Sequence, residues 1–185
     1  MKRLRIIFLL SLVLLAACDA DDKYSNRYAC NFMFYTKYHD TSILTRSLGN
    51  PGAFTIVKVE KKDNVNRLLI SSNSGMGNEE IKLTSALENE RISYQNMGAN
   101  RSLIIGCSNF NGLKAYDRQC PNCIDEFGGV NYPLEFDEND AVVCNKCKRL
   151  YLLNSEGMAV SGEKGDHALL QYRVEYNGEQ MFVHN

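Results

Sequence analysis

Two Cys-x-x-Cys pairs lie close together in the second half of this 185-residue chain, and both have the spacing of metal ligands. The pairs are Cys120/Cys123 and Cys144/Cys147, with twenty residues between them. In each pair the two intervening residues let the chain fold back, so that both thiolates face one point. When two such pairs converge, their four sulfurs can form a tetrahedron around one ion. These four cysteines are therefore the predicted metal ligands.

The residues between the two pairs predict a β-hairpin that would bring the pairs together. Residues 130–136 alternate in character, residues 137–140 (Asp-Glu-Asn-Asp) have the composition of a turn, and residues 141–144 have the pattern of a returning strand. Pairing of these strands would place one Cys-x-x-Cys pair at each outer end of the hairpin. We therefore expect residues 120–147 to form a small metal-binding subdomain.

Four thiolates with this spacing suit Zn²⁺, a single rubredoxin-like iron or an all-cysteine 2Fe-2S cluster. We favour zinc, because zinc-ribbon pairs are separated by about 15–20 residues, and because Ile124 and Lys148 stand where rubredoxin turns usually carry glycine. A zinc ion with four thiolates has a formal charge of about −2, which neighbouring basic residues would partly offset and acidic residues would oppose. These charged neighbours are Lys146, Lys148, Arg149, Asp125 and Glu126.

Two alternatives need no metal. Clustered cysteines in an exported chain commonly form disulfides, so the four cysteines could form two of them. A thiol–disulfide centre is disfavoured, because we predict no helix that begins at a Cys-x-x-Cys pair after a strand. Cys30 and Cys107 are predicted to be buried small residues, with a bond between the two as the alternative. A zinc or disulfide site would be structural, whereas an iron site would permit electron transfer.

The sequence gives little support for an enzyme. It contains no Gly-rich phosphate loop, no pattern of an activated serine or cysteine with a histidine nearby in sequence, and no distinctive pair of carboxylates. We expect His39 and His167 to be polar surface or turn residues. The aromatic residues between positions 28 and 38 are predicted to belong to the core and the sheet faces, in preference to a sugar-binding strip.

The rest of the pattern predicts an all-β, mainly antiparallel fold in one domain, residues 28–185. Apolar residues make up 44% of the chain and prolines number three, which suits a compact core. Asn177-Gly178 is the strongest hairpin signal. A short helix is predicted within residues 39–48, and residues 79–89 fit neither period. The predicted strands cover residues 28–35, 54–59, 67–71, 92–95, 102–107, 113–117, 169–176 and 180–183, and we expect residues 28–119 and 150–185 to build the larger sheets.

The N-terminus has the pattern of a signal peptide followed by a lipid-attachment site. Residues 1–17 open with three basic residues and continue with an apolar run from position 6 to 15, which is too short to span a bilayer. Leu15-Ala-Ala-Cys18 resembles the lipobox of bacterial lipoproteins, whose cysteine is acylated, for example with palmitate, and becomes the first residue. An ordinary secretory signal is the alternative. The resemblance implies a membrane anchor at Cys18, because several acyl chains on one residue bind membrane firmly.

Residues 18–27 would then form an acidic tether. Removing residues 1–17 leaves 168 residues and moves the formal net charge from −1 to −4, so we expect no nucleic-acid partner. Asp19-Ala-Asp-Asp22 resembles the acidic export signal of Bacteroidetes surface lipoproteins, whereas aspartate at this position in enterobacteria is associated with inner-membrane retention. A solvated linker is equally compatible with the run. We expect a lipid-anchored protein of the bacterial cell envelope, at the outer membrane on its periplasmic face or at the cell surface.

Roughly the last 85 residues resemble a Rieske-type domain. The resemblance lies in residues 113–123 (LKAYDRQCPNC), in residues 141–165 around the second pair, and in residues 169–185. It implies stacked sheets, an inserted ligand-binding hairpin and a Gly-rich third loop, residues 161–165. Rieske domains hold a 2Fe-2S cluster with two cysteines and two histidines. Here Asn122 and Cys147 stand at the two histidine positions, so the two-histidine cluster is excluded and a four-cysteine site takes its place.

Overall fold

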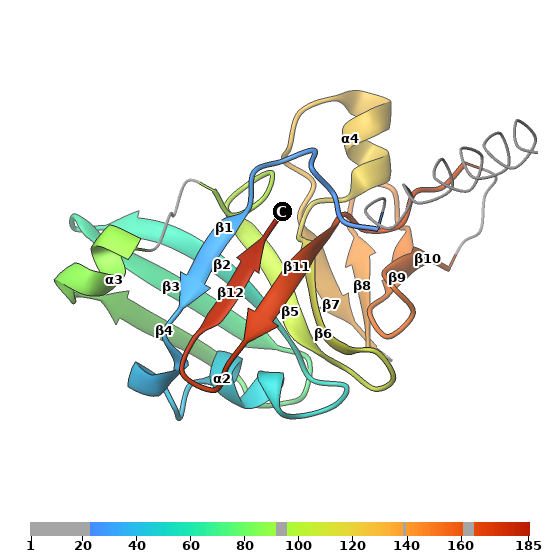
Figure 1. The fold of residues 1–185 in the computed structure, drawn as a ribbon. Coiled ribbons are helices and arrows are strands. Elements are labelled where there is room, and N and C mark those ends of the chain that lie inside the picture. The colour runs from blue at the N-terminus through green and yellow to red at the C-terminus, as the bar shows by residue number, and fades with distance from the viewer. Residues whose placement is uncertain (1–22, 92–95, 139, 161–164) are drawn as a thin grey trace, which may run out of the picture.

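The computed structural model describes residues 23–91, 96–138, 140–160 and 165–185. Within these ranges the chain is mostly antiparallel β-sheet with a few short helices, which confirms the predicted all-β class (Figure 1). None of the helices in these ranges is both long enough and apolar enough to cross a membrane. The predicted strand at residues 92–95, the signal peptide and Cys18 lie outside the described residues.

The larger sheet has eight strands in the order β1-β12-β11-β6-β5-β2-β3-β4, and every neighbouring pair is antiparallel. The sheet is strongly curved (Figure 1). Asn177 and Gly178 form the turn between the last two strands, as predicted. The strands are β1 (Asn31–Phe34), β2 (Phe54–Lys62), β3 (Val65–Ser72), β4 (Asn78–Leu83), β5 (Ser102–Ser108), β6 (Gly112–Asp117), β11 (Gln171–Tyr176) and β12 (Met181–His184).

The second sheet has four strands in the order β10-β9-β8-β7. The predicted hairpin is present as β7 (Leu134–Asp137) and β8 (Ala141–Cys144). Two further strands extend it, β9 (Leu150–Leu152) and β10 (Met158–Ala159). Our assignment of the chain from residue 150 onward to the larger sheets was therefore wrong for these two strands. A short turn after β8 reverses the chain at once, so β9 pairs with β8.

The short helices account for the remaining elements. Helix η2 (Thr36–Tyr38) precedes α2 (Ile43–Leu48), which lies within the predicted helix and begins after Ser42, whose hydroxyl accepts from two backbone N–H groups. The ambiguous residues 79–89 divide between β4 and α3 (Ala86–Arg91), so a strand period and a helix period occur in succession. Helix α4 (Pro121–Phe127) follows β6 and precedes β7 in the chain, in a segment where we predicted no helix.

Two apolar cores lie on opposite faces of the larger sheet. Val57 and Val59 of β2 belong to the core that also contains α2, whereas Phe54 and Ile56 belong to the core shared with the second sheet. Burial on both faces explains the nearly continuous apolar sequence of β2. Cys120, Cys123 and Cys144 are members of the second core. The predicted metal ligands therefore lie in the packed interface between the two sheets.

Candidate metal centre

The first pair of cysteines is positioned by α4. Cys120 is the residue that precedes the helix, Pro121 occupies its first position, and Cys123 follows within the first turn. Residues three apart lie on the same side of a helix, so both sulfurs point the same way. Proline at the first position and Gly128 after the last turn are the usual sequence signals of helix ends, and they could have identified α4.

The second pair is positioned by the turn after β8. The N–H of Lys148 donates to the carbonyl of Cys144 at 2.8 Å, and the N–H of Cys144 donates to the carbonyl of Arg149 at 3.0 Å. Lys148 has a φ of 63°, in the left-handed region that favours glycine. This tight turn brings Cys147 back towards Cys144, as metal-ligand spacing requires.

The four sulfurs form one compact group, which we call the four-cysteine cluster (Cys120, Cys123, Cys144 and Cys147). All four lie within 4.8 Å of one another. The Sγ atoms of Cys120 and Cys147 are 3.7 Å apart, and those of Cys123 and Cys144 are 3.6 Å apart. A tetrahedral ion with metal–sulfur bonds of about 2.3 Å places its sulfurs about 3.8 Å apart. The two distances therefore fit one ion bound by all four thiolates.

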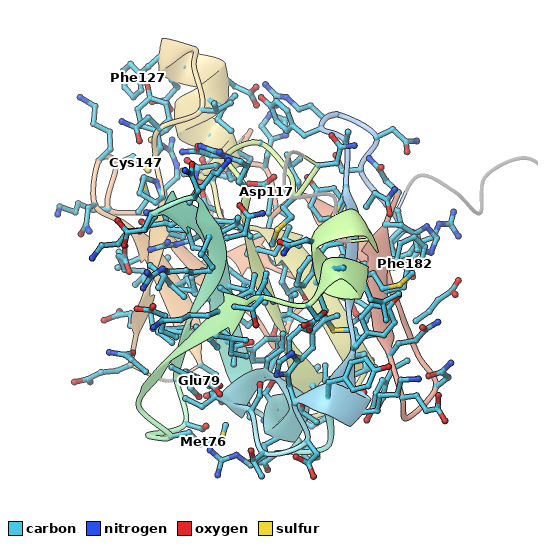
Figure 2. All side chains as sticks on the ribbon, turned by 90° about the vertical axis from the view of Figure 1, so that its left-hand side faces the viewer. Met76, Glu79, Asp117, Phe127, Cys147 and Phe182 are labelled. Carbon is cyan, nitrogen blue, oxygen red and sulfur yellow. The ribbon has the colours of Figure 1, made fainter. Side chains whose placement is uncertain are left out.

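The cluster is enclosed on most sides. Three of its cysteines are fully or almost fully buried, and Cys147 is half-buried. Cys147 and the exposed Phe127 at the end of α4 lie at one side of the molecule, and Phe182 of β12 lies at the other (Figure 2). The six cysteines in the described residues are free thiols. The S···S distances in the cluster exceed the disulfide bond length of about 2.05 Å.

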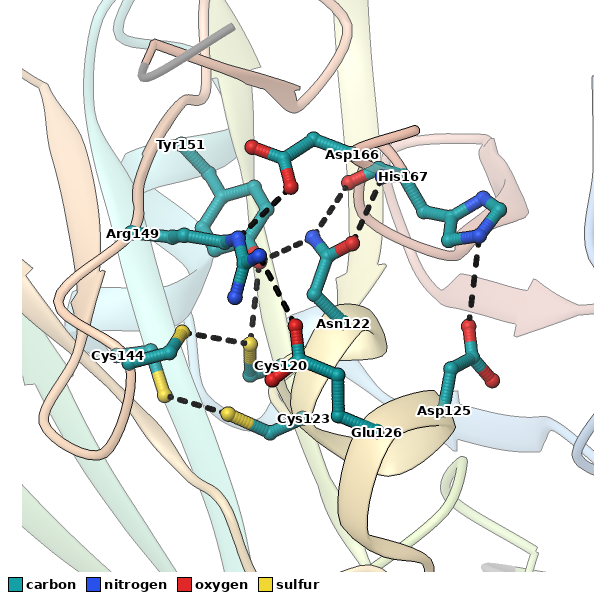
Figure 3. Close-up of polar contacts among 11 residues, drawn as sticks. Cys120, Asn122, Cys123, Asp125, Glu126, Cys144, Arg149, Tyr151, Asp166 and His167 are labelled. Atoms are coloured by element: carbon teal, nitrogen blue, oxygen red, sulfur yellow. Dashed lines mark hydrogen bonds and ion pairs between the residues drawn. The ribbon is translucent and has the colours of Figure 1, made fainter. Parts of the chain in front are cut away.

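A buried tyrosine and an asparagine hold the first pair in place (Figure 3). The hydroxyl of Tyr151 lies 3.1 Å from the sulfur of Cys120, and it accepts a hydrogen bond from the side-chain amide of Asn122 at 2.9 Å. Asn122 also binds the backbone of His167, with its amide donating at 3.2 Å and its oxygen accepting at 2.9 Å. Asn122 thus fixes the backbone at His167, which follows the segment 161–164 outside the described residues.

Arg149 supplies positive charge beside the cluster. Its guanidinium donates to Asp166 at 2.8 Å and to Glu126 at 3.0 Å. Burial acts to raise the pKa of Cys147, but hydrogen bonds from the backbone and side chain of Arg149, together with those to Cys123 and Cys144, outweigh burial and lower that pKa to about 7. A lowered pKa favours the thiolate, which is the form that binds a metal. Arg149 is therefore the basic neighbour that acts directly on the cluster.

The net pKa shift is opposite in the first pair, because burial dominates there. Burial raises the pKa of Cys120 to about 11, although hydrogen bonding by Tyr151 acts against the rise. It also raises the pKa of Cys123. Four thiols packed this closely, three of them buried, cannot all ionise without a cation among them, because each thiolate disfavours the next. A bound divalent ion would supply that charge.

The other residues singled out from the sequence are not members of the four-cysteine cluster. Cys30 is buried and its thiol lies near the carbonyl of Val183, whereas Cys107 is half-buried. His39 pairs with Glu88 at 2.6 Å, so it is mostly enclosed, not a plain surface residue, and His167 is 64% exposed. The predicted core aromatics differ in burial: Phe32, Phe34 and Tyr35 are buried, Tyr28 is half-buried, and Tyr38 is exposed.

One argument against a thiol–disulfide centre was wrong. The first Cys-x-x-Cys pair does lie at the N-terminus of a helix, after strand β6. The geometry nevertheless differs from that of a dithiol centre, because Cys120 has a hydrogen-bond-range contact with Cys147 of the other turn. The contact of Tyr151 with Cys120 spans 31 residues of the chain and that of Asp166 with Arg149 spans 17, and no local sequence signal marks either contact.

Comparisons of the chain with protein-family models, curated proteins and solved structures found no match.

Proposed function

We propose that this protein is a lipid-anchored protein of the bacterial cell envelope whose four-cysteine cluster binds one structural zinc ion. The observation that carries the metal assignment is the clustering of four sulfurs within 4.8 Å. Zinc bound by four thiolates has no open coordination position, so such a site stabilises a fold and performs no reaction. The ion would connect α4, the end of β8 and the turn before β9 at the interface of the two sheets.

The spacing of the sulfurs supports one ion in preference to a 2Fe-2S cluster. A two-iron cluster binds two cysteines on each iron, which separates the sulfurs of different irons more widely than those on one iron. All four sulfurs here lie within 4.8 Å of one another, and the two closest distances match a single tetrahedron. Zinc is favoured over a single iron because the N–H groups of Ile124 and Lys148, at the positions of the rubredoxin glycines, donate to carbonyl oxygens.

We also infer that the domain is a Rieske-like domain whose ligand set consists of four cysteines. Two cysteine-bearing segments that meet at one point, and a third segment at Asp166 and His167 beside them, support this inference. The lipid anchor rests on the lipobox-like residues that end at Cys18. The acidic residues that follow are compatible with the outer membrane, on the periplasmic face or at the cell surface.

Metal analysis and a visible spectrum of the anaerobically purified protein test the metal assignment. We expect one zinc per chain and no visible colour, because zinc has no d–d transitions and no redox chemistry. Absorption between about 400 and 600 nm, which iron–thiolate sites produce, would replace zinc with iron and favour electron transfer. A protein without metal and without free thiols would overturn the metal site in favour of disulfides.

A matched pair of serine variants tests the structural role. Cys144→Ser removes a buried ligand and should abolish zinc binding and loosen the domain, because structural zinc contributes free energy to folding. Cys107→Ser changes a half-buried thiol outside the cluster and should leave the zinc content unchanged. Hydrogen exchange across α4 and β8 gives the readout. Equal zinc content in both variants would contradict the ligand assignment.

The anchor has its own test. Cys18→Ala should abolish palmitate labelling and move the protein from the membrane fraction to the soluble fraction, because only several acyl chains hold a protein firmly on a bilayer. Cys30→Ala is the control, since Cys30 is buried in the domain. Membrane association of Cys18→Ala equal to that of the unchanged protein would refute the anchor.

A further inference from the structure

The first described residues of the chain are fixed to one side of the domain. The Lys23 ammonium group lies 3.1 Å from Glu156, in the turn between β9 and β10. The N–H of Ser25 donates to the carbonyl of Gln171 at 2.8 Å, and Arg27 pairs with Asp125 of α4 at 2.7 Å. Figure 1 shows this segment passing below α4 towards β9 and β10. The tether is therefore attached to the β10 side of the molecule.

The length of chain between Cys18 and Lys23 limits how far that side can be from a membrane. Five residues of fully extended chain span at most about 16–18 Å. An acylated Cys18 would place its backbone at the membrane surface. Glu156, in contact with Lys23, is then close to the bilayer, and the domain cannot present an arbitrary side to it.

Apolar side chains are exposed on this same side. Met158 is 60% exposed and Val160 is 54% exposed, and both lie within four residues of Glu156. Phe110, at the turn between β5 and β6, is 82% exposed. Its neighbour Asn109 donates a backbone hydrogen bond to Asn154 at 2.9 Å, which places this turn beside the loop that leads to β10. We call Phe110, Met158 and Val160 the β10 face.

The carboxylate beside the β10 face is paired with two ammonium groups. Glu156 accepts hydrogen bonds from the buried Lys114 at 2.7 and 2.9 Å and pairs with Lys23 at 3.1 Å. Burial tends to raise the pKa of Glu156, but these two ammonium groups outweigh it and lower the pKa. The carboxylate next to the exposed apolar residues is thus neutralised within the protein. An apolar face whose neighbouring carboxylate is neutralised suits the zwitterionic boundary of a lipid bilayer.

We propose that the β10 face rests on the lipid surface, with Met158 and Val160 at the boundary between headgroups and acyl chains. This inference depends on the proposed lipid anchor at Cys18, and it adds the orientation of the domain on the membrane. A lipid occupant is favoured over a protein partner, because a tether of five residues holds this face near the bilayer at all times. The acidic residues at positions 19, 21 and 22 favour zwitterionic over anionic lipid.

The absence of tryptophan from the chain permits a direct test. The lipidated full chain with Val160→Trp is reconstituted into phosphatidylcholine vesicles with or without bromine on the acyl chains. Interfacial side chains lie about 5–10 Å into the boundary region, so we expect bromolipid to reduce the fluorescence emission of the tryptophan at position 160 by about half. Leu87→Trp is the control, because Leu87 is 39% exposed on α3, at the opposite side of the molecule from β10 (Figure 1).

The outcomes separate the orientation from the anchor. Val160→Trp quenched by bromolipid, with Leu87→Trp unaffected, supports the inference. If bromolipid quenches the fluorescence of both tryptophan variants equally in vesicle-bound protein, the orientation is overturned and the anchor stays in place. A full chain that does not float with the vesicles overturns the anchor and the orientation together. Met158→Trp provides a second reporter on the same face in case Val160→Trp folds poorly.

Discussion

Replacing Tyr151 with phenylalanine should weaken metal binding more than it weakens the fold. The ring of Tyr151 is fully buried, and its hydroxyl lies between the sulfur of Cys120 and the amide of Asn122. Tyr151→Phe keeps the ring and removes only the oxygen. Asn122 retains its contact with the carbonyl of His167, so the main loss is the hydrogen bond to sulfur.

The charge on that sulfur sets the magnitude. In the metal-bound protein Cys120 is a thiolate, and a hydrogen bond to a charged group contributes about 1.5–3 kcal/mol. In the metal-free protein burial raises the pKa of Cys120 to about 11, so the neutral thiol predominates at pH 7. A hydrogen bond between neutral groups contributes about 0.5–1.5 kcal/mol. The difference, about 1–1.5 kcal/mol, corresponds to an affinity loss of about 5- to 15-fold.

Competition with a chromophoric zinc chelator measures the affinity, and urea denaturation in the presence of a strong chelator measures the stability of the metal-free fold. Tyr116→Phe is the matched control, because Tyr116 is also fully buried and its hydroxyl donates to the carbonyl of Leu153, not to a sulfur. It should lower the stability and leave zinc affinity unchanged. Equal affinities for Tyr151→Phe and the unchanged protein, or an equal loss in Tyr116→Phe, would refute the reasoning.

Two further predictions concern oxidation and pH. In metal-free protein treated with hydrogen peroxide, we expect disulfides that join Cys120 to Cys147 and Cys123 to Cys144, because these sulfurs lie 3.7 and 3.6 Å apart. Peptide mapping that finds a bond within either Cys-x-x-Cys pair would contradict this geometry. Burial raises the pKa of Asp117 above its ordinary value of 3.8, so the folded protein holds this proton more tightly than the unfolded chain. The contribution of that protonation to stability is complete below the unfolded pKa and is lost as pH rises through the folded pKa. Asp117→Asn should therefore remove a downward slope from the free energy of unfolding plotted against pH above about 4. Denaturant titrations that give the same slope for both proteins would argue against a raised pKa.

Local sequence signals predicted elements where one face or one turn decides the structure. Asn177 and Gly178 form the predicted hairpin turn, and Ser42 begins α2 where a helix start was expected. Helix α4 was missed because the segment between the two cysteine pairs was interpreted only as a hairpin, although Pro121 and Gly128 mark the ends of the helix. Short helices depend on such end signals more than on periodicity.

The sequence by itself determined the candidate ligands, since two Cys-x-x-Cys pairs impose tight turns wherever they occur. It also determined the β class, because alternating and β-branched runs can bury a face only in sheets. Only the tertiary structure decided the order of the strands, the membership of β9 and β10 in the second sheet, and the contacts of Tyr151 and Asp166 with the site. These features join residues far apart in the chain, and they depend on which apolar faces pack together, which no local pattern specifies.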